Sequence, residues 1–395
     1  MIYTDNAATT KMSKAAIQAM LPYLDTIYGN PSSPHSMGQV ASEALRSSRK
    51  TIAEILGCNA NEIYFTSGGS EADNQAILSA AAYGAQNGKK HIISTAIEHH
   101  AVLHTLTKLE KHGFAITLLD AHHDGIVRTE DFLQAIRPDT ALATVMYANN
   151  EIGTIQPIRE IGAICREKGI LFHTDAVQAV GHMDIVVNKD HFDLLSLSAH
   201  KFHGPKGVGV LYAKRGVPLT NLIEGGAQER GKRAGTENIP AIVAMAAVLK
   251  EAAAHMEENT AKVTAMRDRL TEGLLQIPRS MLNGDSKRRL PGNVNVCYEG
   301  IEGESLLLLL NQKGICASSG SACTSGSLDP SHVLLAIGRA PEIAHGSLRL
   351  SLSEENTPEE IASIIKTVAE VVTTLRGMSP VWDDLQKSEK CCMIE

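Results

Sequence analysis

The stretch "EIYFTSGGSEADNQAILSAAAYGAQ", residues 62–86, contains the unit that decides the fold. Its start, "EIYFTSG", is typical of a short buried strand that runs into a glycine turn, and "SEADNQAILSAAAYGAQ" has a helical pattern. The same order recurs where "KHIIST" precedes "EHHAVLHTLTKLEKHG" and where "ALATVMYAN" precedes "PIREIGAICREKG". Strands separated by helices of this length predict a mostly parallel α/β sheet that is covered on both faces.

The carboxyl-terminal part of the chain has a different pattern. A long helical pattern over residues 239–273 leads into two further strands, "NVNVCYE" and "SLRLSLS", and into helices over residues 303–313 and 357–376. We therefore expect a second, smaller α/β unit after the parallel sheet. The chain shows no internal repeats, and we expect its last residues to form a disordered tail.

Composition narrows the classes of partner. The chain has 395 residues, of which 43% are hydrophobic, and a net charge of −7 with scattered basic residues. This favours a small-molecule substrate over nucleic acid or an anionic membrane. Its apolar runs are too short to span a bilayer, and "MIYTDNAATT" at the amino end lacks the pattern of a leader. We expect a cytoplasmic protein.

The seven cysteines predict thiol chemistry at one position. Their number is odd, and their spacing fits neither a metal site nor a disulfide scaffold, so we expect reduced thiols and no metal. Cys323 lies in "ASSGSACTSGS", a run of small residues that suits a mobile loop, and is a candidate nucleophile. Four others lie in or beside apolar patterns typical of packing residues: Cys58, Cys165, Cys297 and Cys316.

Polar residues follow several predicted strands, where ligands of parallel sheets gather. Gly69 and Ser70 could offer backbone N–H groups to a phosphate, although this motif taken alone favours a plain turn with an N-cap serine. Asp175 could bind a protonated ring nitrogen or cap a helix, and His99 could stack on a ring or lie on a helix surface.

Two lysines follow the strand "DLLSLSA". Lys201, just beyond the buried strand, suits a reactive amine, because low-dielectric surroundings lower a lysine pKa. Lys206 lies in "GPKGVG", which leads into a strand and so does not fit a dinucleotide-binding motif. A phosphate cradle, a carboxylate for a ring nitrogen, a stacking side chain and an amine together match pyridoxal 5'-phosphate.

The chain also resembles a known family over nearly its whole length. The motifs, in the family's order, are "YTDNAATT", "GNPSSPHSMG", "FTSGGSEADN", "EHHAV", "ANNEIGTIQPI", "HTDAVQAVG", "SLSAHKFHGPKGVGVLY", "GGAQERGKRAGTEN", "SSGSACTSGSLDPSHVL" and "HGSLRLSL". They resemble those of pyridoxal-phosphate-dependent cysteine desulfurases of the NifS/IscS type, in the class V aminotransferase family. Two positions depart from many relatives, namely Ser70, where threonine is common, and Ala199, where glycine is common.

This resemblance implies fold type I, the aspartate-aminotransferase-like fold, with a large domain built on a mostly parallel seven-stranded sheet and a smaller α/β domain. Residues 13–255 would form the large cofactor-binding domain. Residues 1–12 and 256–380 would form the small domain, which carries the cysteine loop, and residues 381–395 would form the tail.

The resemblance also implies roles for individual residues. Lys201 would form the Schiff base with the cofactor, Cys323 would become a persulfide, and Arg349 would bind the substrate carboxylate. Thr236 would reach the phosphate of the other subunit, which implies a homodimer. The remaining implied cofactor contacts are His99 over the ring, Asp175 at its nitrogen, Asn150 (also beside the substrate) and Gln178 at the ring and its oxygen, and Gly69, Ser70, Ser198 and His200 at the phosphate.

The implied reaction converts L-cysteine to L-alanine and leaves sulfur on Cys323 for an acceptor protein. That acceptor could be an iron–sulfur scaffold, a tRNA thiolation enzyme or a nitrogenase assembly factor. A selenocysteine lyase or an aminotransferase of the same fold is an alternative, although transamination needs no thiol. A non-catalytic sulfur-relay scaffold is a second one, to which the tail residues Cys391 and Cys392 give slight support.

Overall fold

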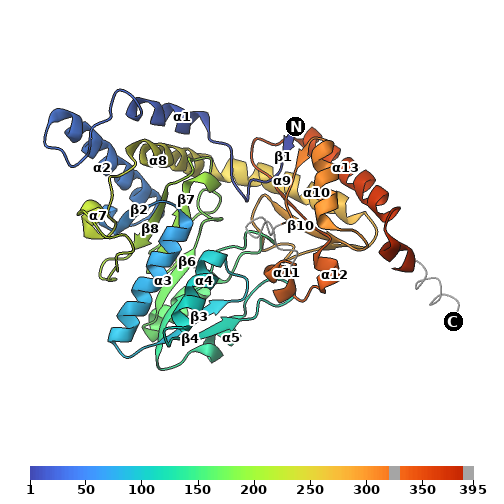
Figure 1. Cartoon of the computed structure of the whole chain (residues 1–395), viewed down its shortest axis with the longest axis horizontal. Helices are drawn as coiled ribbons and strands as arrows, with labels where there is room; N and C mark the ends of the chain where they lie inside the picture. The colour runs from blue at the N-terminus through green and yellow to red at the C-terminus, as the bar shows by residue number, and fades with distance from the viewer. Residues whose placement is uncertain (320–329, 386–395) are drawn as a thin grey trace.

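The computed structural model describes residues 1–319 and 330–385 (Figure 1). These residues form a seven-stranded sheet, a three-stranded sheet and a two-stranded sheet. The large sheet and its connections contain β2 (Ile63–Thr66), α3 (Gly69–Gln86), β3 (His91–Thr95), α4 (His100–Glu110), β4 (Ala115–Leu119), α5 (Thr129–Ala135), β5 (Thr140–Thr144), α6 (Ile158–Lys168), β6 (Leu171–Asp175), β7 (Leu194–Ser198), η3 (Ala199–Lys201) and β8 (Gly209–Ala213).

The strand order of the large sheet is β2-β8-β7-β6-β5-β3-β4. Strand β8 is antiparallel to β2 and β7, and every other pairing in this sheet is parallel. The predicted mostly parallel sheet of seven strands is confirmed. Because the parallel strands share one direction, their carboxyl ends lie along one edge of the sheet, where the connecting turns can meet.

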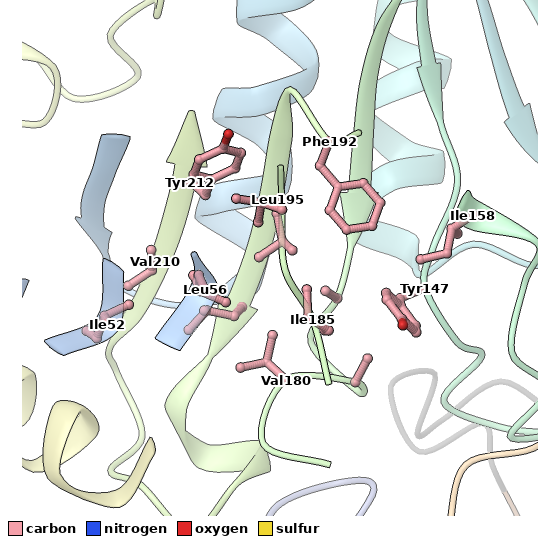
Figure 2. Packing of buried hydrophobic residues seen from close by; sticks show 14 of the residues in the cluster. Ile52, Leu56, Tyr147, Ile158, Val180, Ile185, Phe192, Leu195, Val210 and Tyr212 are labelled. Atoms are coloured by element: carbon pink, nitrogen blue, oxygen red, sulfur yellow. The ribbon is translucent and has the colours of Figure 1, made fainter. Parts of the chain in front are cut away.

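Helices cover both faces of this sheet, as the sequence pattern predicts. On one face α3 contacts β5, β6, β7 and β8 and buries small residues such as Ala76 and Ala80. On the other face Ile52 and Leu56 lie near Val210 of β8 (Figure 2). The helices before and after the sheet are α1 (Lys14–Met20), η1 (Leu21–Tyr23), α2 (Ser36–Leu56), η2 (Ala60–Glu62), α7 (Gln228–Gly231) and α8 (Ile239–Ala254).

The smaller sheets have their own apolar core. Strand β10 lies between β12 and β9 and is antiparallel to both, while β1 and β11 pair in parallel. The elements are β1 (Ile2–Tyr3), α9 (Met256–Leu275), β9 (Ser280–Leu282), β10 (Asn293–Tyr298), α10 (Gly303–Gln312), β11 (Ile315–Cys316), α11 (His332–Ala336), α12 (Pro341–Ala344), β12 (Ser347–Ser351) and α13 (Pro358–Arg376). The division of the chain into domains at residues 12 and 255 stays a prediction, as does the disordered tail, most of which lies outside the described residues.

The helical pattern over residues 239–273 is two helices rather than one. Helices α8 and α9 are bent by 74° around His255, whose backbone is not helical. The apolar α8 packs on α1 and α2, whereas α9 packs on α13 and β10. The chain therefore turns between α8 and α9, because the first helix packs with elements of the large sheet and the second with elements of the smaller sheets. In the described part of the chain no single helix is long and apolar enough to cross a membrane, and only the bent pair of α8 and α9 reaches that length and composition.

Candidate active site

A cavity of about 400 Å³ lies at the carboxyl ends of the parallel strands. His99 follows β3, Asn150 follows β5, and Lys201 follows β7, so the sheet itself brings these distant residues together. Ten residues expected at the site line this one cavity: Gly69, Ser70, His99, Asn150, Asp175, Gln178, Ser198, His200, Lys201 and Arg349.

The amino end of α3 lines one part of the cavity. Its N-cap residue is Gly68, and within the described residues no side chain donates or accepts a capping hydrogen bond there. A Cβ atom on Gly209 would lie 2.7 Å from the Gly68 Cα, so glycine at 209 lets β8 approach this turn closely. A helix amino end with uncapped N–H groups suits an anion such as a phosphate.

Ser198 and His200 line the same part of the site from the end of β7. Burial, together with the charges of Lys201 and Lys206, lowers the pKa of His200 to about 4. The imidazole is therefore neutral at pH 7, and its Nδ1 lies 3.1 Å from the Thr9 hydroxyl. A neutral ring can still donate one hydrogen bond to a phosphate oxygen.

Asp175 is the last residue of β6 and is buried. Burial raises the pKa of its carboxyl group, and the charges of His99 and Lys201 and a 2.9 Å hydrogen bond from the Val177 N–H oppose that rise. A buried carboxylate is stabilised by a cation, and a protonated pyridine nitrogen would supply one.

His99 is the N-cap of α4, and this position fixes its tautomer. Its Nδ1 accepts a 3.1 Å hydrogen bond from the Ala101 N–H, so in the neutral ring the proton lies on Nε2. The side chain lines the cavity and acts electrostatically on Asp175. His99 Nε2–H is thus a proton donor at the site.

Lys201 lies in the cavity, whereas Lys206 is exposed on its turn. The Lys201 amine donates hydrogen bonds to the carbonyl oxygens of Ala7 and Ala8, at 2.5 and 2.9 Å. Gln178 also donates to the Ala7 oxygen, at 2.9 Å. The amino-terminal segment therefore orients both side chains from across the cavity, and of the two lysines only Lys201 is placed for chemistry there.

Arg349 enters the cavity from β12 and is 2% exposed. Its Nη2 donates to Asp5 at 2.9 Å and its Nη1 to the Asn150 carbonyl at 3.1 Å. Its Nε is buried and has no hydrogen-bond partner among residues 1–319 and 330–385. A buried guanidinium with unused hydrogen-bonding capacity suits a carboxylate ligand.

Some residues of the cavity were not expected from the sequence. Ala7 and Ala8 contribute through backbone oxygens, which no side-chain pattern reveals. Asp73 also lines the cavity. It lies one helical turn beyond Ser70 in α3, so it is on the same face of the helix. That spacing could have indicated that Asp73 lies at the cavity.

Two expected residues lie elsewhere. Thr236 lines a separate small cavity with Ser67 and Gly207, beside the 2.9 Å ion pair of Arg233 and Glu71. Cys323 lies outside the described residues. On the near side of its loop, Ser318 exchanges backbone hydrogen bonds with Arg349, and the Ser319 carbonyl accepts from the Ser347 hydroxyl. Ser318, five residues before Cys323, therefore lies next to Arg349 of the cavity.

Three of the four described cysteines behave as packing residues. Cys165 and Cys297 are buried, and burial raises the pKa of both thiols. Burial likewise raises the pKa of Cys58 to about 12. Thiols that stay protonated at neutral pH are poor nucleophiles, so these three cannot replace the expected reactive cysteine.

Comparisons with known proteins agree with this geometry. The family model for aminotransferase class-V matches residues 2–364. A curated relative named cysteine desulfurase IscS, from Methanosarcina thermophila, is 54% identical over 380 residues, which cover 96% of this chain and 94% of that protein.

Solved structures give the same result for the fold. A NifS-like protein superposes with a TM-score of 0.89 at 36% identity and covers 95% of this chain and 100% of its own. A structure titled SspA in complex with cysteine matches with a TM-score of 0.80 at 36% identity and covers 90% of this chain and 100% of its own. The expected type I fold is confirmed. Its cavity, its sequence and its relatives together place this chain in the cysteine desulfurase family of the class V aminotransferases.

Proposed function

We propose that this protein is a cysteine desulfurase that uses pyridoxal 5'-phosphate to convert L-cysteine to L-alanine and transfers the sulfur to Cys323. The observation that carries the proposal is the convergence of ten expected site residues on one cavity in a chain of this family. The homologues imply a pyridoxal-phosphate-dependent enzyme.

The described residues fit that cofactor. Asp175 would bind the ring nitrogen, and the open amino end of α3 with Ser198 and His200 would hold the phosphate. Lys201 would hold the aldehyde carbon. When bound, the cofactor supplies an electron sink that stabilises negative charge at the substrate Cα.

The protein's own groups would then bind the substrate and move its protons. Arg349 would bind the α-carboxylate in the cavity that it lines together with Lys201. Lys201 Nζ would remove the proton from the substrate Cα. His99 Nε2–H would be a proton donor in the same cavity.

The sulfur step needs Cys323, which follows the described residue Ser319 by four positions. The Cys323 thiolate would attack the substrate sulfur, so that the new S–S bond forms as the C–S bond breaks. The bonding electrons return to the carbon skeleton, which is protonated and released as alanine. Sulfur remains on Cys323 as a persulfide, and no external oxidant is needed.

Two cysteine variants test this proposal. Cys323→Ser should keep the yellow bound cofactor and bind L-cysteine but lose persulfide formation and at least about 99% of alanine release, because serine is not a sulfur acceptor. Cys316→Ser, on β11 seven residues earlier, should keep near-normal turnover. Mass spectrometry of the digested protein should find one added sulfur on the peptide of residue 323. Normal turnover by Cys323→Ser would refute the proposal.

We further propose that the active form is a cytoplasmic homodimer in which Thr236 contributes to the partner's phosphate site. In support, Thr236 lies outside the cavity of its own chain. Large apolar side chains are also exposed around α1 and η1, among them Leu21, Leu24 and Tyr28, the last at 75%. Apolar groups gathered in this way favour burial against another copy.

Sedimentation would measure the subunit number. The partnership itself is tested by mixing Thr236→Ala with Lys201→Ala protein. In a shared-site dimer, the mixed dimers should contain one site with both defects and one with neither, so activity should return.

We propose an iron–sulfur scaffold protein as the sulfur acceptor, which radiolabelled sulfur transfer to purified candidates would test.

A further inference from the structure

The proposed function leaves one buried acid without a role. Asp73 of α3 is 1% exposed and lines the same cavity as Asp175. Its Oδ1 is buried and has no hydrogen-bond partner within the described parts of the chain. An acid in such a position carries a high energetic cost unless its charge is balanced or removed by a proton.

The nearest basic group does not balance it. His173 Nε2 lies 3.6 Å from Asp73 Oδ1. The ring is fully buried between the hydroxyls of Thr144, 2.8 Å from Nδ1, and Ser196, 3.0 Å from Nε2. Burial lowers the pKa of His173 to about 3, so it is neutral at pH 7 and provides no positive charge.

The neighbouring charges act differently on the buried acids Asp73, Glu98 and Asp175. Burial and the charges of Asp175 and Glu98 raise the pKa of Asp73 well above its usual range, although the Ser196 hydroxyl opposes this. Glu98 is itself buried, accepts from the Thr95 hydroxyl and the Met146 N–H, and has a pKa raised to about 8 by burial. Asp175, in contrast, has the Lys201 ammonium and the His99 ring acting on it, and both oppose the rise of its pKa.

We propose that Asp73 is a positioning residue for the cofactor ring, acting as a neutral carboxylic acid in the cavity that it lines together with Asp175. Two carboxyl groups in one buried site cannot both ionise at low cost, so they share a single proton. Asp73 carries that proton, and Asp175 is the anion of the pair. This inference rests on the proposed use of pyridoxal phosphate and adds to it the means by which the charge at the ring nitrogen is set.

The test compares Asp73→Asn with Asp73→Ala. Asparagine keeps a neutral, polar group of the same shape, whereas alanine removes the group that stabilises the Asp175 charge. We expect Asp73→Ala to move the pH midpoint of the bound cofactor's absorbance by about one unit and to weaken cofactor binding about tenfold. Asp73→Asn should move the midpoint by less than about 0.3 unit and bind within about twofold of the parent.

Infrared spectroscopy of the cofactor-free protein provides a second readout. At pH 7 the parent spectrum minus the Asp73→Asn spectrum should show a protonated carboxyl C=O band, because the band of protonated Glu98 is common to both proteins and cancels. Glu62→Gln is the matched control, because Glu62 is a buried acid of η2 outside the cavity. It should lower the unfolding temperature without moving the cofactor's pH midpoint.

Three results would overturn the inference. If the band is unchanged in Asp73→Asn, Asp73 is not protonated. If Asp73→Asn moves the midpoint as far as Asp73→Ala, Asp73 acts as an anion. If neither variant moves it, Asp73 only packs. Failure of the parent protein to bind pyridoxal phosphate would instead refute the proposed function, and the infrared result would still decide the protonation of Asp73.

Discussion

Arg349 donates a 2.9 Å hydrogen bond to Asp5, although 343 residues separate them along the chain. Arg349 lies on β12, and Asp5 precedes the Ala7–Ala8 segment that contacts Lys201. The small sheet and the amino-terminal segment therefore meet at the cavity and hold the guanidinium there. A charged group fixed in advance loses little entropy when a carboxylate binds.

Replacing this arginine should weaken substrate binding selectively. Arg349→Gln removes the charge but keeps a polar side chain, and the loss of a charge-assisted pair costs about 2–3 kcal/mol. We expect KM for L-cysteine to rise by about 30- to 150-fold, while the cofactor's affinity stays within about twofold. Steady-state kinetics and a cofactor titration measure the two effects separately. An unchanged KM would show that the carboxylate binds elsewhere.

Lys201 and Lys206, which both follow β7, should differ in their covalent chemistry. Lys201→Ala removes the amine that lies in the cavity, so borohydride should no longer fix the cofactor to the protein. Lys206→Ala changes only an exposed side chain and should leave the linkage intact. Mass spectrometry of the reduced, digested protein locates the adduct. An adduct that persists in Lys201→Ala would exclude Lys201 as the linking residue.

Gly209→Ala should damage the phosphate side of the cavity. An added Cβ would lie 2.5 Å from the Leu197 carbonyl oxygen and 2.7 Å from Gly68 Cα, and both contacts are with backbone. Relief of that clash requires β8 or the turn before α3 to move, at a cost of about 1–3 kcal/mol. We expect lower stability and at least about tenfold weaker cofactor binding.

Gly216→Ala is the matched control for this substitution. Gly216 has a positive φ, of 98°, which Gly209 does not, and its added Cβ would meet nothing within 4 Å in the part of the chain that the structure describes. The backbone strain alone should cost about 1 kcal/mol and leave cofactor binding unchanged. Denaturant unfolding and equilibrium dialysis separate the two effects. Equal cofactor affinity in both variants would contradict the role assigned to the close approach.

An ion pair outside the cavity gives the stability a defined pH dependence. His203 Nε2 lies 3.3 Å from Glu354 Oε1, and Glu354 is 35% exposed. Burial alone would raise the pKa of Glu354, but the close contact with His203 and its charge lower it to about 2. Burial alone would lower the pKa of His203, but the close contact with Glu354 and its charge raise it above its usual 6.5.

The sign of the effect follows from these two shifts. The Glu354 contribution is complete above about pH 4.5, its unfolded value, and is lost as the pH falls towards 2. The His203 contribution is complete below about pH 6.5 and is lost as the pH rises through its folded value. Glu354→Gln should therefore lower the free energy of unfolding by about 1 kcal/mol near pH 5.5, after allowance for exposure. The difference should shrink at pH 3 and at pH 9, and an equal loss at all three pH values would contradict an ionic origin.

The sequence by itself determined most of the fold and the identity of the reactive groups. The alternation of short buried strands with helices is a local pattern that can be read directly from the sequence, and it predicted the parallel sheet. Strand ends with glycine, aspartate and lysine pointed to a phosphate cradle, a ring-nitrogen partner and an amine. Because parallel strands place their carboxyl ends at one edge, these side chains met as expected.

Only the tertiary structure decided what those residues touch. Three features depend on which distant surfaces pack together. They are the bend at His255, the contact of Lys201 with the carbonyl oxygens of Ala7 and Ala8, and the pairing of Arg349 with Asp5. The raised pKa of Asp73 depends on burial and on the charge of Asp175, and neither is local. Residue order fixes which chemical groups are present, but solvent exclusion and distance fix their charge, and both arise only when the chain is folded.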